Sequence, residues 1–347
     1  MLCRLTEVAG LGHLPGTALR AVLAAGTAWL LCILAGPFVL RQLARLGIRE
    51  RTEKTPIEDD ALRRSIADKS GTLTMGGLIL LAGLFGACAA WADLTDPLLL
   101  LALAVTGAMA VVGVADDRAK ILGRTHTQRG LKVCHKLILQ GVTGAALGLL
   151  LVQRTGRPLL GLSPSWGPWI VPAGLAWSAL VVATMSNATN VTDGLDGLLA
   201  GLAVPAAVVL GIACWAAGSA RPAVAELSVF CAALAGACLG FLRFNRHPAR
   251  VFMGDTGSMA VGAGLAAVAL AAGQEVVLGL AGLVFLLEFG SSLLQIGWFH
   301  AFGRRILPFA PVHHVFQKKD YPEPRIVLGF YLVGGAAALA GLGSLLV

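Results

Sequence analysis

The stretch SNATNVTDGLDGLLAG, residues 186–201, carries side chains that could bind a charged ligand, although long apolar runs flank it on both sides. It holds two asparagines and two aspartates, and its glycines would let the backbone approach a ligand closely. Four other segments carry similar groups: DKSGTLTMGG with Lys69 and Thr74, GVADDRAK with Asp116, Asp117 and Lys120, FNRHPARVFMGDTGS with Asn245 and Asp255, and FAPVHHVFQKKDYPEPR with His313 and His314.

These residue types together indicate a metal-assisted site for phosphate groups. Crowded aspartates repel one another unless a cation neutralises them. Carboxylate oxygens select hard cations such as Mg²⁺, which usually binds one or two carboxylates together with substrate phosphate oxygens. Lysines add point charges for phosphates. The five segments therefore predict a single site that is assembled from separate parts of the chain.

Each group alone has a simpler explanation. Asp193 and Asp255 precede apolar runs and could merely cap helices. The pair Asp116 and Asp117 could be a solvated helix end, and the two adjacent histidines could be interfacial residues without a role. Taken together, these simpler explanations are insufficient. They would require five independent segments to bring such groups to the same face of the membrane by chance.

The elements that must position these groups are membrane helices. The chain has 347 residues, of which 56% are hydrophobic and 13% charged, whereas soluble proteins carry about 25% charged residues. Apolar runs near twenty residues, long enough to cross about 30 Å of hydrocarbon, recur along the chain. We predict an all-α polytopic membrane protein with one domain over residues 1–347 and ten transmembrane helices, at about 17–40, 73–92, 97–115, 134–153, 168–185, 198–217, 222–242, 257–272, 274–298 and 326–346.

The basic residues predict the orientation of these helices. Of the 27 Lys and Arg residues, 22 lie in or next to the loops that follow odd-numbered spans, and 5 lie on the other side. The positive-inside rule then places the odd-numbered loops in the cytoplasm and both termini outside. All five polar segments fall on the cytoplasmic side. The net charge of +8 is thus explained by topology, and we expect no nucleic-acid partner.

Six motifs, in this order, resemble the bacterial phospho-N-acetylmuramoyl-pentapeptide transferases of the polyprenyl-phosphate N-acetylhexosamine-1-phosphate transferase superfamily, glycosyltransferase family 4. They are KSGTLTMGG, DDRAK, NATNVTDGLDGLLAG, NRHPARVFMGDTGSMAVG, EFGSSLLQ and FAPVHHVFQKKDYPEPR. The resemblance runs from about residue 40 to the C-terminus. It implies transfer of phospho-MurNAc-pentapeptide from UDP-MurNAc-pentapeptide to undecaprenyl phosphate, giving lipid I and UMP in peptidoglycan synthesis. It also implies Mg²⁺ as cofactor, a bacterial inner-membrane location with the catalytic face in the cytoplasm, and a possible homodimer.

Residue by residue, the resemblance implies catalytic roles for Asp116, Asp117, Asp193, Asp255 and His313. Among these, Asp116 matches the candidate base, and Asp255 and Asp193 match the metal site. Phe252 would stack on uracil. The implied substrate contacts are Lys69, Thr74, Lys120, Lys136, Asn187, Asn190, Gly194, Leu195, Asp196, Asn245, Phe252 and His314.

The sequence departs from the family pattern in two of these motifs. The usual PIHHHFE reads PVHHVFQ here, so that Val315 and Gln317 replace a histidine and a glutamate. Leu73 replaces the proline of GTPTMGG. The following YPEPR favours the muramoyl branch over the branch that transfers GlcNAc-phosphate.

Two rival functions differ in what they would require. A UDP-GlcNAc transferase of the same superfamily would differ in the histidine segment. A transporter or channel would carry ionisable groups along a path through the membrane. Glu288 in FLLEFG is the only acid placed well inside a predicted span, and the other acids gather at one face. This distribution favours interfacial catalysis over transport, and a purely structural scaffold would leave the five polar segments unexplained.

Overall fold

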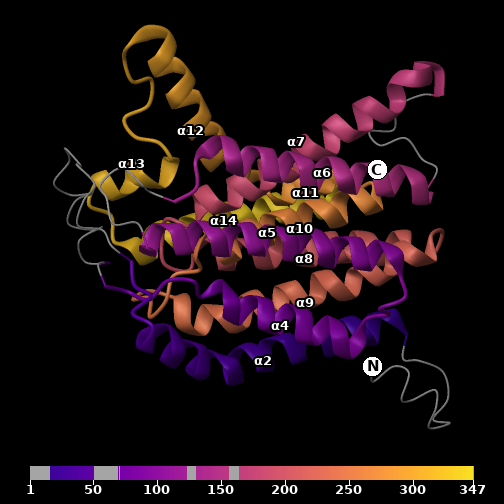
Figure 1. Cartoon of the computed structure of the whole chain (residues 1–347), viewed down its shortest axis with the longest axis horizontal. Helices are drawn as coiled ribbons and strands as arrows, with labels where there is room; N and C mark the ends of the chain where they lie inside the picture. Colours follow the sequence, from indigo (N-terminus) through magenta and orange to yellow (C-terminus); the bar gives the residue numbers. More distant parts are fainter. Residues whose placement is uncertain (1–15, 51–68, 70, 123–129, 156–163, 347) are drawn as a thin grey trace.

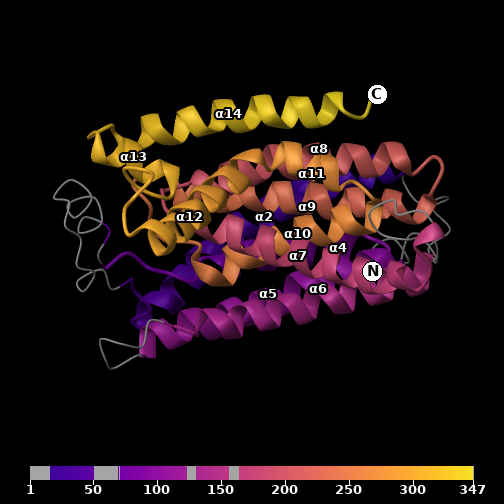
Figure 2. The same cartoon turned by 90° about the horizontal axis from the view of Figure 1, so that it is seen from above.

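The structure is a computed structural model that describes residues 16–50, 69, 71–122, 130–155 and 164–346. Its α-helices form a bundle in which most of them run side by side along the long axis of the molecule (Figures 1 and 2). They are α2 Thr17–Arg45, α4 Gly77–Trp91, α5 Pro97–Leu122, α6 Val133–Thr155, α7 Ile170–Thr192, α8 Leu198–Ala217, α9 Pro222–Asn245, α10 Gly254–Ala272, α11 Glu275–Ala281, α12 Leu283–Phe302, α13 Val312–Lys318 and α14 Glu323–Gly343. The prediction of an all-α polytopic membrane protein is confirmed.

Nine of the described helices are long and apolar enough to cross a membrane, and α4 is a shorter apolar helix of 15 residues. The described chain begins and ends at the same end of the bundle (Figures 1 and 2). This arrangement agrees with an even number of crossings and with two termini on one side of the membrane.

The helix ends differ from the predicted spans where the site lies. Helix α5 continues to Leu122 and α7 to Thr192, beyond the predicted ends at 115 and 185. Asp116, Asp117 and Asn190 therefore belong to helices and not to loops. A polar side chain does not interrupt the backbone hydrogen bonds of a helix. The helix can therefore continue beyond the last residue of the apolar segment.

The predicted ninth span is also divided. The expected break after the eighth span is confirmed at Gly273, which has φ +68° and ends α10. A second break at Gly282 separates the short helix α11 from α12. A Cβ at Gly282 would lie 2.8 Å from the carbonyl oxygen of Leu278, so a side chain would not fit there. Helix α12 then rises away from the bundle (Figure 1).

Helix α10 lies at the centre of the bundle. Every residue from Asp255 to Ala272 is buried, and glycine and alanine dominate this segment. Small side chains let helix backbones approach closely in membrane proteins, where packing and not the hydrophobic effect drives association. Helices α5 and α10 touch at Gly113 of α5, next to the polar residues at the start of α10. A Cβ at Gly113 would overlap the backbone of Asp255 and Thr256.

We predict that Gly113→Ala destabilises the protein by about 1–3 kcal/mol, because the added methyl group must push two helix backbones apart. Gly107→Ala on the same helix is the matched control, since its Cβ would meet the Phe85 ring at an ordinary 3.6 Å. Melting temperatures in detergent measure both. Equal melting temperatures for the two variants would contradict the close contact of α5 and α10.

Candidate active site

Three aspartates meet where the end of α5 reaches the start of α10. Asp116 and Asp117 lie in the last two turns of α5, and Asp255 is the second residue of α10. All three are buried, and one carboxylate oxygen of each lies within 4.8 Å of the others. The close approach at Gly113 brings them together. We call Asp116, Asp117 and Asp255 the aspartate cluster.

Two lysines neutralise much of the aspartate cluster. Lys120 Nζ lies 2.8 Å from Asp116 Oδ2 and 2.7 Å from Asp255 Oδ1. Lys136 Nζ, from α6, lies 2.9 Å from Asp116 Oδ2 and 2.6 Å from Asp255 Oδ2. Three carboxylates against two ammonium groups leave one formal negative charge. Because burial strengthens such interactions, the site retains a strong attraction for a further cation.

Asp117 also holds the start of α10 in place. Its carboxylate accepts the backbone N–H groups of Asp255 at 3.0 Å and Thr256 at 2.9 Å, and the Thr256 hydroxyl at 2.7 Å. These amides belong to the first turn of α10, which has no partners within the helix. A carboxylate from another helix thus caps α10.

The asparagines of α7 have different partners. The Asn190 amide donates to Asp255 Oδ1 at 3.0 Å and to Ser258 Oγ at 2.9 Å, so it orients the carboxylate of Asp255. The Asn187 amide instead donates to Gln140 Oε1 on α6 at 2.7 Å. Asn190 therefore joins the aspartate cluster, whereas Asn187 ties α7 to α6 beside it.

A second polar cluster lies around Asp196. Its Oδ2 is 3.1 Å from His247 Nδ1, and its backbone N–H donates to Glu323 Oε1 at 2.5 Å. Lys69 Nζ lies 3.1 Å from Asp196 Oδ1 and 2.7 Å from Glu323 Oε1. We call Asp196, His247 and Glu323 the second cluster. The sequence analysis missed His247, in the loop after α9, and Glu323, at the start of α14, because a single polar residue in a loop or at a helix end carries no periodic signal.

Other predicted substrate contacts surround the second cluster. The Asn245 carboxamide accepts the Gly197 N–H at 3.1 Å and donates to the Val251 carbonyl oxygen at 3.0 Å, which fixes the loop before α8. Lys69 Nζ lies 5.8 Å from the centre of the Phe252 ring. Leu195, in the loop before α8, is buried, whereas Phe252 belongs to the loop before α10.

The loop residue Asp193 interacts electrostatically with Asp255 and Asp117 of the aspartate cluster and with Lys69, which lies at the second cluster. Burial raises the pKa of Asp193 well above its usual range, and the negative charges of Asp255 and Asp117 raise it further. Asp193 is not among the residues whose oxygens come within 4.8 Å of one another in either cluster. Its role as a metal ligand therefore stays a prediction.

The remaining predicted residues lie at the edge of the site. Thr74 is buried, and a Cβ on Gly254 would lie 3.2 Å from its hydroxyl oxygen. His313 is 1% exposed and lies against Gly194. Burial and the neighbouring His313 lower the pKa of His314 to about 4, so His314 is neutral at pH 7. Its Nδ1 lies 2.6 Å from Gln317 Oε1, one of the residues that departs from the family motif.

The aspartate cluster fits a hard divalent cation. Every potential ligand is a carboxylate oxygen, which suits Mg²⁺. Asp116 Oδ2 is buried, and the ammonium groups of Lys120 and Lys136 lie 2.8 Å and 2.9 Å from it. The second cluster mixes a histidine nitrogen with carboxylates, whereas the aspartate cluster offers carboxylate oxygens alone. The donor chemistry therefore favours the aspartate cluster as the metal site.

Comparison with known proteins identifies the family of this chain. Residues 99–273 match the model of glycosyl transferase family 4. The phospho-N-acetylmuramoyl-pentapeptide-transferase of Gluconacetobacter diazotrophicus is 38% identical over 94% of this chain and 92% of its own length. The enzyme of the same name from Caulobacter vibrioides is 34% identical over 96% of this chain and 95% of its own length. The chain belongs to the phospho-N-acetylmuramoyl-pentapeptide-transferase family. The resemblance seen in six motifs thus extends over nearly the whole transferase.

We predict that Glu323→Ala exposes the Asp196 backbone, because Glu323 accepts its N–H. Hydrogen bonds to charged groups contribute about 1.5–3 kcal/mol, so deuterium exchange of the Asp196 amide should accelerate about tenfold or more. Mass spectrometry of peptides over residues 193–198 measures the exchange. Arg325→Ala, two positions later at an exposed site of α14, is the matched control. Unchanged exchange in Glu323→Ala would contradict the contact.

Proposed function

We propose that this transferase moves phospho-N-acetylmuramoyl-pentapeptide from UDP-MurNAc-pentapeptide to undecaprenyl phosphate, which yields lipid I and UMP. Membership of the family supports the activity. The observation that carries the chemistry is the buried aspartate cluster with its two lysines. We further propose that the site faces the cytoplasm at the bacterial inner membrane, which the bias of basic residues supports.

In the proposed reaction an oxygen of the lipid phosphate attacks the phosphorus that bears the sugar. The bond from this phosphorus to the bridging oxygen breaks, and the electron pair leaves with UMP. The second pKa of a phosphate monoester is near 6, so most of the attacking phosphate is a dianion at pH 7. No proton then has to be removed, and we assign positioning to Asp116, the residue that the resemblance marks as a base.

The protein residues hold charge in fixed positions for this step. Phosphoryl transfer depends mainly on positioning and on neutralising the phosphate oxygens. Lys120 and Lys136 are each within 3 Å of two carboxylates, and in this position their ammonium groups can also meet phosphate oxygens. Mg²⁺ bound by Asp116, Asp117 and Asp255 would neutralise the donor diphosphate when it is present. Asn190 would keep the Asp255 carboxylate turned toward the cation.

We place the donor nucleotide at the second cluster. Phe252 offers a face for the uracil ring, and the backbone from Gly194 to Asp196 offers polar groups to its edge. Lys69, which lies between Asp196, Glu323 and the Phe252 ring, would bring a positive charge next to the nucleotide. Asp193 would then lie between the base and the diphosphate, where the two clusters meet.

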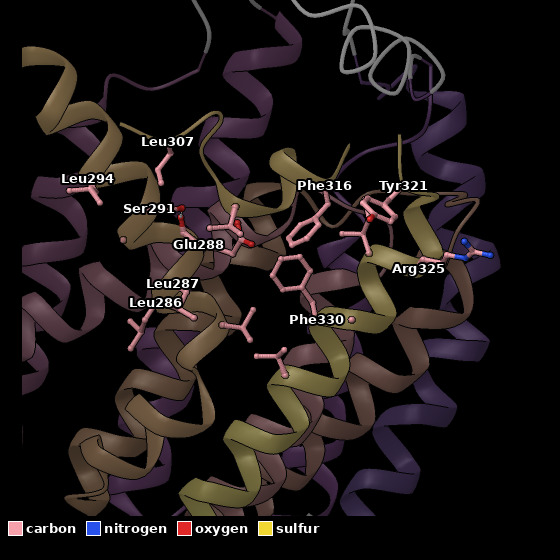
Figure 3. A pocket seen from close by; sticks show the side chains of 16 residues that line it. Leu286, Leu287, Glu288, Ser291, Leu294, Leu307, Phe316, Tyr321, Arg325 and Phe330 are labelled. Atoms are coloured by element: carbon pink, nitrogen blue, oxygen red, sulfur yellow. Dashed lines mark hydrogen bonds between the residues drawn. The ribbon is translucent and has the colours of Figure 1, made fainter. Parts of the chain in front are cut away.

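For the acceptor we propose the apolar cavity between α12 and α14. This cavity of about 800 Å³ is lined almost entirely by apolar side chains from both helices and from α13 (Figure 3). An apolar concave site suits a polyprenyl chain. Glu288 and Ser291 are polar exceptions on its α12 wall. Because α12 rises from the bundle, a lipid could enter from the side.

Release of UMP by the purified transferase tests the proposal. Undecaprenyl phosphate and Mg²⁺ are supplied with either UDP-MurNAc-pentapeptide or UDP-GlcNAc, and EDTA is added to matched samples. We expect release from the muramoyl donor that EDTA abolishes. Release from UDP-GlcNAc alone would move the chain to the other branch of the superfamily. Absence of release from both donors by folded protein would refute the proposed function.

We predict that Asp255→Asn lowers the rate of UMP release more than about 100-fold, because it removes a ligand charge and unbalances both lysines. Asp320→Asn is the matched control, since Asp320 is exposed and its φ of +54° suits asparagine. Steady-state kinetics at saturating donor measures both. A rate of UMP release for Asp255→Asn within tenfold of the wild-type rate would contradict the assignment of Asp255 as a metal ligand.

A further inference from the structure

Glu288 is a buried acid that the proposed reaction does not use. It lies on the membrane-spanning helix α12 and is 0% exposed. An ionisable side chain inside a membrane span is costly, and such residues are retained where they have a specific partner. The partner of Glu288 is His313, from the short helix α13.

The carboxylate of Glu288 binds His313 in two ways. The His313 backbone N–H points to both carboxylate oxygens, at 3.2 Å and 3.4 Å. The ring nitrogen Nδ1 lies 2.9 Å from Glu288 Oε2. Because an ionised carboxylate only accepts hydrogen bonds, the Nδ1 atom must carry a proton in this contact. Backbone and ring are thus fixed by one side chain.

The other ring nitrogen of His313 is buried and has no hydrogen-bond partner among the described residues. It faces Gly194, because a Cβ on Gly194 would overlap the imidazole and lie 2.8 Å from its Cε1. Gly194 belongs to the loop where we place the donor nucleotide. Buried polar atoms in native proteins have partners, so an open Nε2 at this position indicates a missing ligand group.

We infer that Glu288 is a positioning residue for the proposed transfer, which it serves by holding the proton of His313 on Nδ1 and turning a proton-free Nε2 toward the donor site. The hydrogen bond at one ring nitrogen determines the role of the other. A proton-free Nε2 accepts a hydrogen bond, so the group that it meets is a hydroxyl of the nucleotide-sugar and not a phosphate oxygen. This inference rests on the proposed function.

A purely structural ion pair would look different. Both ring nitrogens would then have partners, and a well-packed apolar pair would serve as well or better. Glu288 also lines the cavity that we assign to the acceptor (Figure 3). One residue therefore borders the proposed lipid cavity and orients a histidine at the proposed nucleotide site.

The first test is a double-mutant cycle on kcat/KM for the UDP donor. Glu288→Leu replaces the acid with an apolar side chain of similar size, and we expect a 10–100-fold loss, as for residues that orient a catalytic group. Glu288→Gln keeps one acceptor oxygen and should retain more activity. Glu288→Leu should cause little further loss in a His313→Asn background. Multiplied losses in the double variant would overturn the inference.

The matched control is Ser292→Ala, on the same helix one turn after Glu288. Its hydroxyl donates to the carbonyl oxygen of Glu288, so the variant perturbs α12 without touching the carboxylate. We expect kcat/KM within twofold of wild type. A loss as large as that of Glu288→Leu would mean that any change in this part of α12 is harmful and would overturn a specific role for the acid.

The second test reads the tautomer directly and needs no turnover. In protein labelled with ¹⁵N-histidine, the His313 signals are those lost in His313→Asn. At pH 8 we expect a protonated Nδ1 and a bare Nε2 in wild type, and a shift toward the other tautomer in Glu288→Leu. A proton on Nε2 in wild type, or no change in the variant, would overturn the inference. These spectra do not depend on activity. They therefore test the inference about Glu288 even if the protein releases no UMP.

Discussion

The burial of three carboxylates side by side is the constraint on which the proposed site depends. Each would repel the others strongly in a medium of low dielectric constant, and Asp116, Asp117 and Asp255 come within 4.8 Å of one another. The arrangement is possible because Lys120 and Lys136 lie between them and because Asp117 receives the first amides of α10. Small residues in α5 and α10 make the approach possible. The same features leave one negative charge, which suits the cluster to the divalent cation that we propose for it.

The second cluster depends on residues from opposite ends of the sequence. Lys69, Asp196 and Glu323 are mutually bonded, so that the segment before α4, the loop before α8 and the first turn of α14 are held together. The loop with Asp193 lies between this group and the aspartate cluster. A ligand with a ring at one end and a diphosphate at the other would match the second cluster with its ring and the aspartate cluster with its diphosphate. This match is the structural basis for the proposal of a nucleotide-sugar as the ligand.

Much of this architecture follows from the sequence. Long apolar runs predict the helices, and Gly273 was correctly predicted to end the eighth span. The convergence of the five polar segments was predicted because separate loops carried complementary charges on one side. The break at Gly282 was not predicted, since a glycine within an apolar run resembles the many glycines that pack helices. The continuation of α5 and α7 into polar residues was missed for a different reason, because hydropathy marks the membrane boundary and not the helix end.

Individual partners were beyond the reach of the sequence. The pattern gives Asp117 a place in the site, but its capping of α10 depends on a contact across 138 positions. His247 and Glu323 carry no local signal, and the pairing of Glu288 with His313 appears only when α12 and α13 are placed in space. Such contacts depend on how helices pack, whereas the sequence reports mainly which residues each helix offers.

The most direct test of this account is to locate the cation. Crystals of the transferase grown with Mn²⁺, a substitute for Mg²⁺ that scatters anomalously, would give a peak at each bound ion. We expect one peak among the carboxylates of Asp116, Asp117 and Asp255, with Asn190 still bonded to Asp255. A peak at Asp196, His247 and Glu323 instead, or no peak at Mn²⁺ concentrations that support turnover, would contradict the assignment of the aspartate cluster as the metal site.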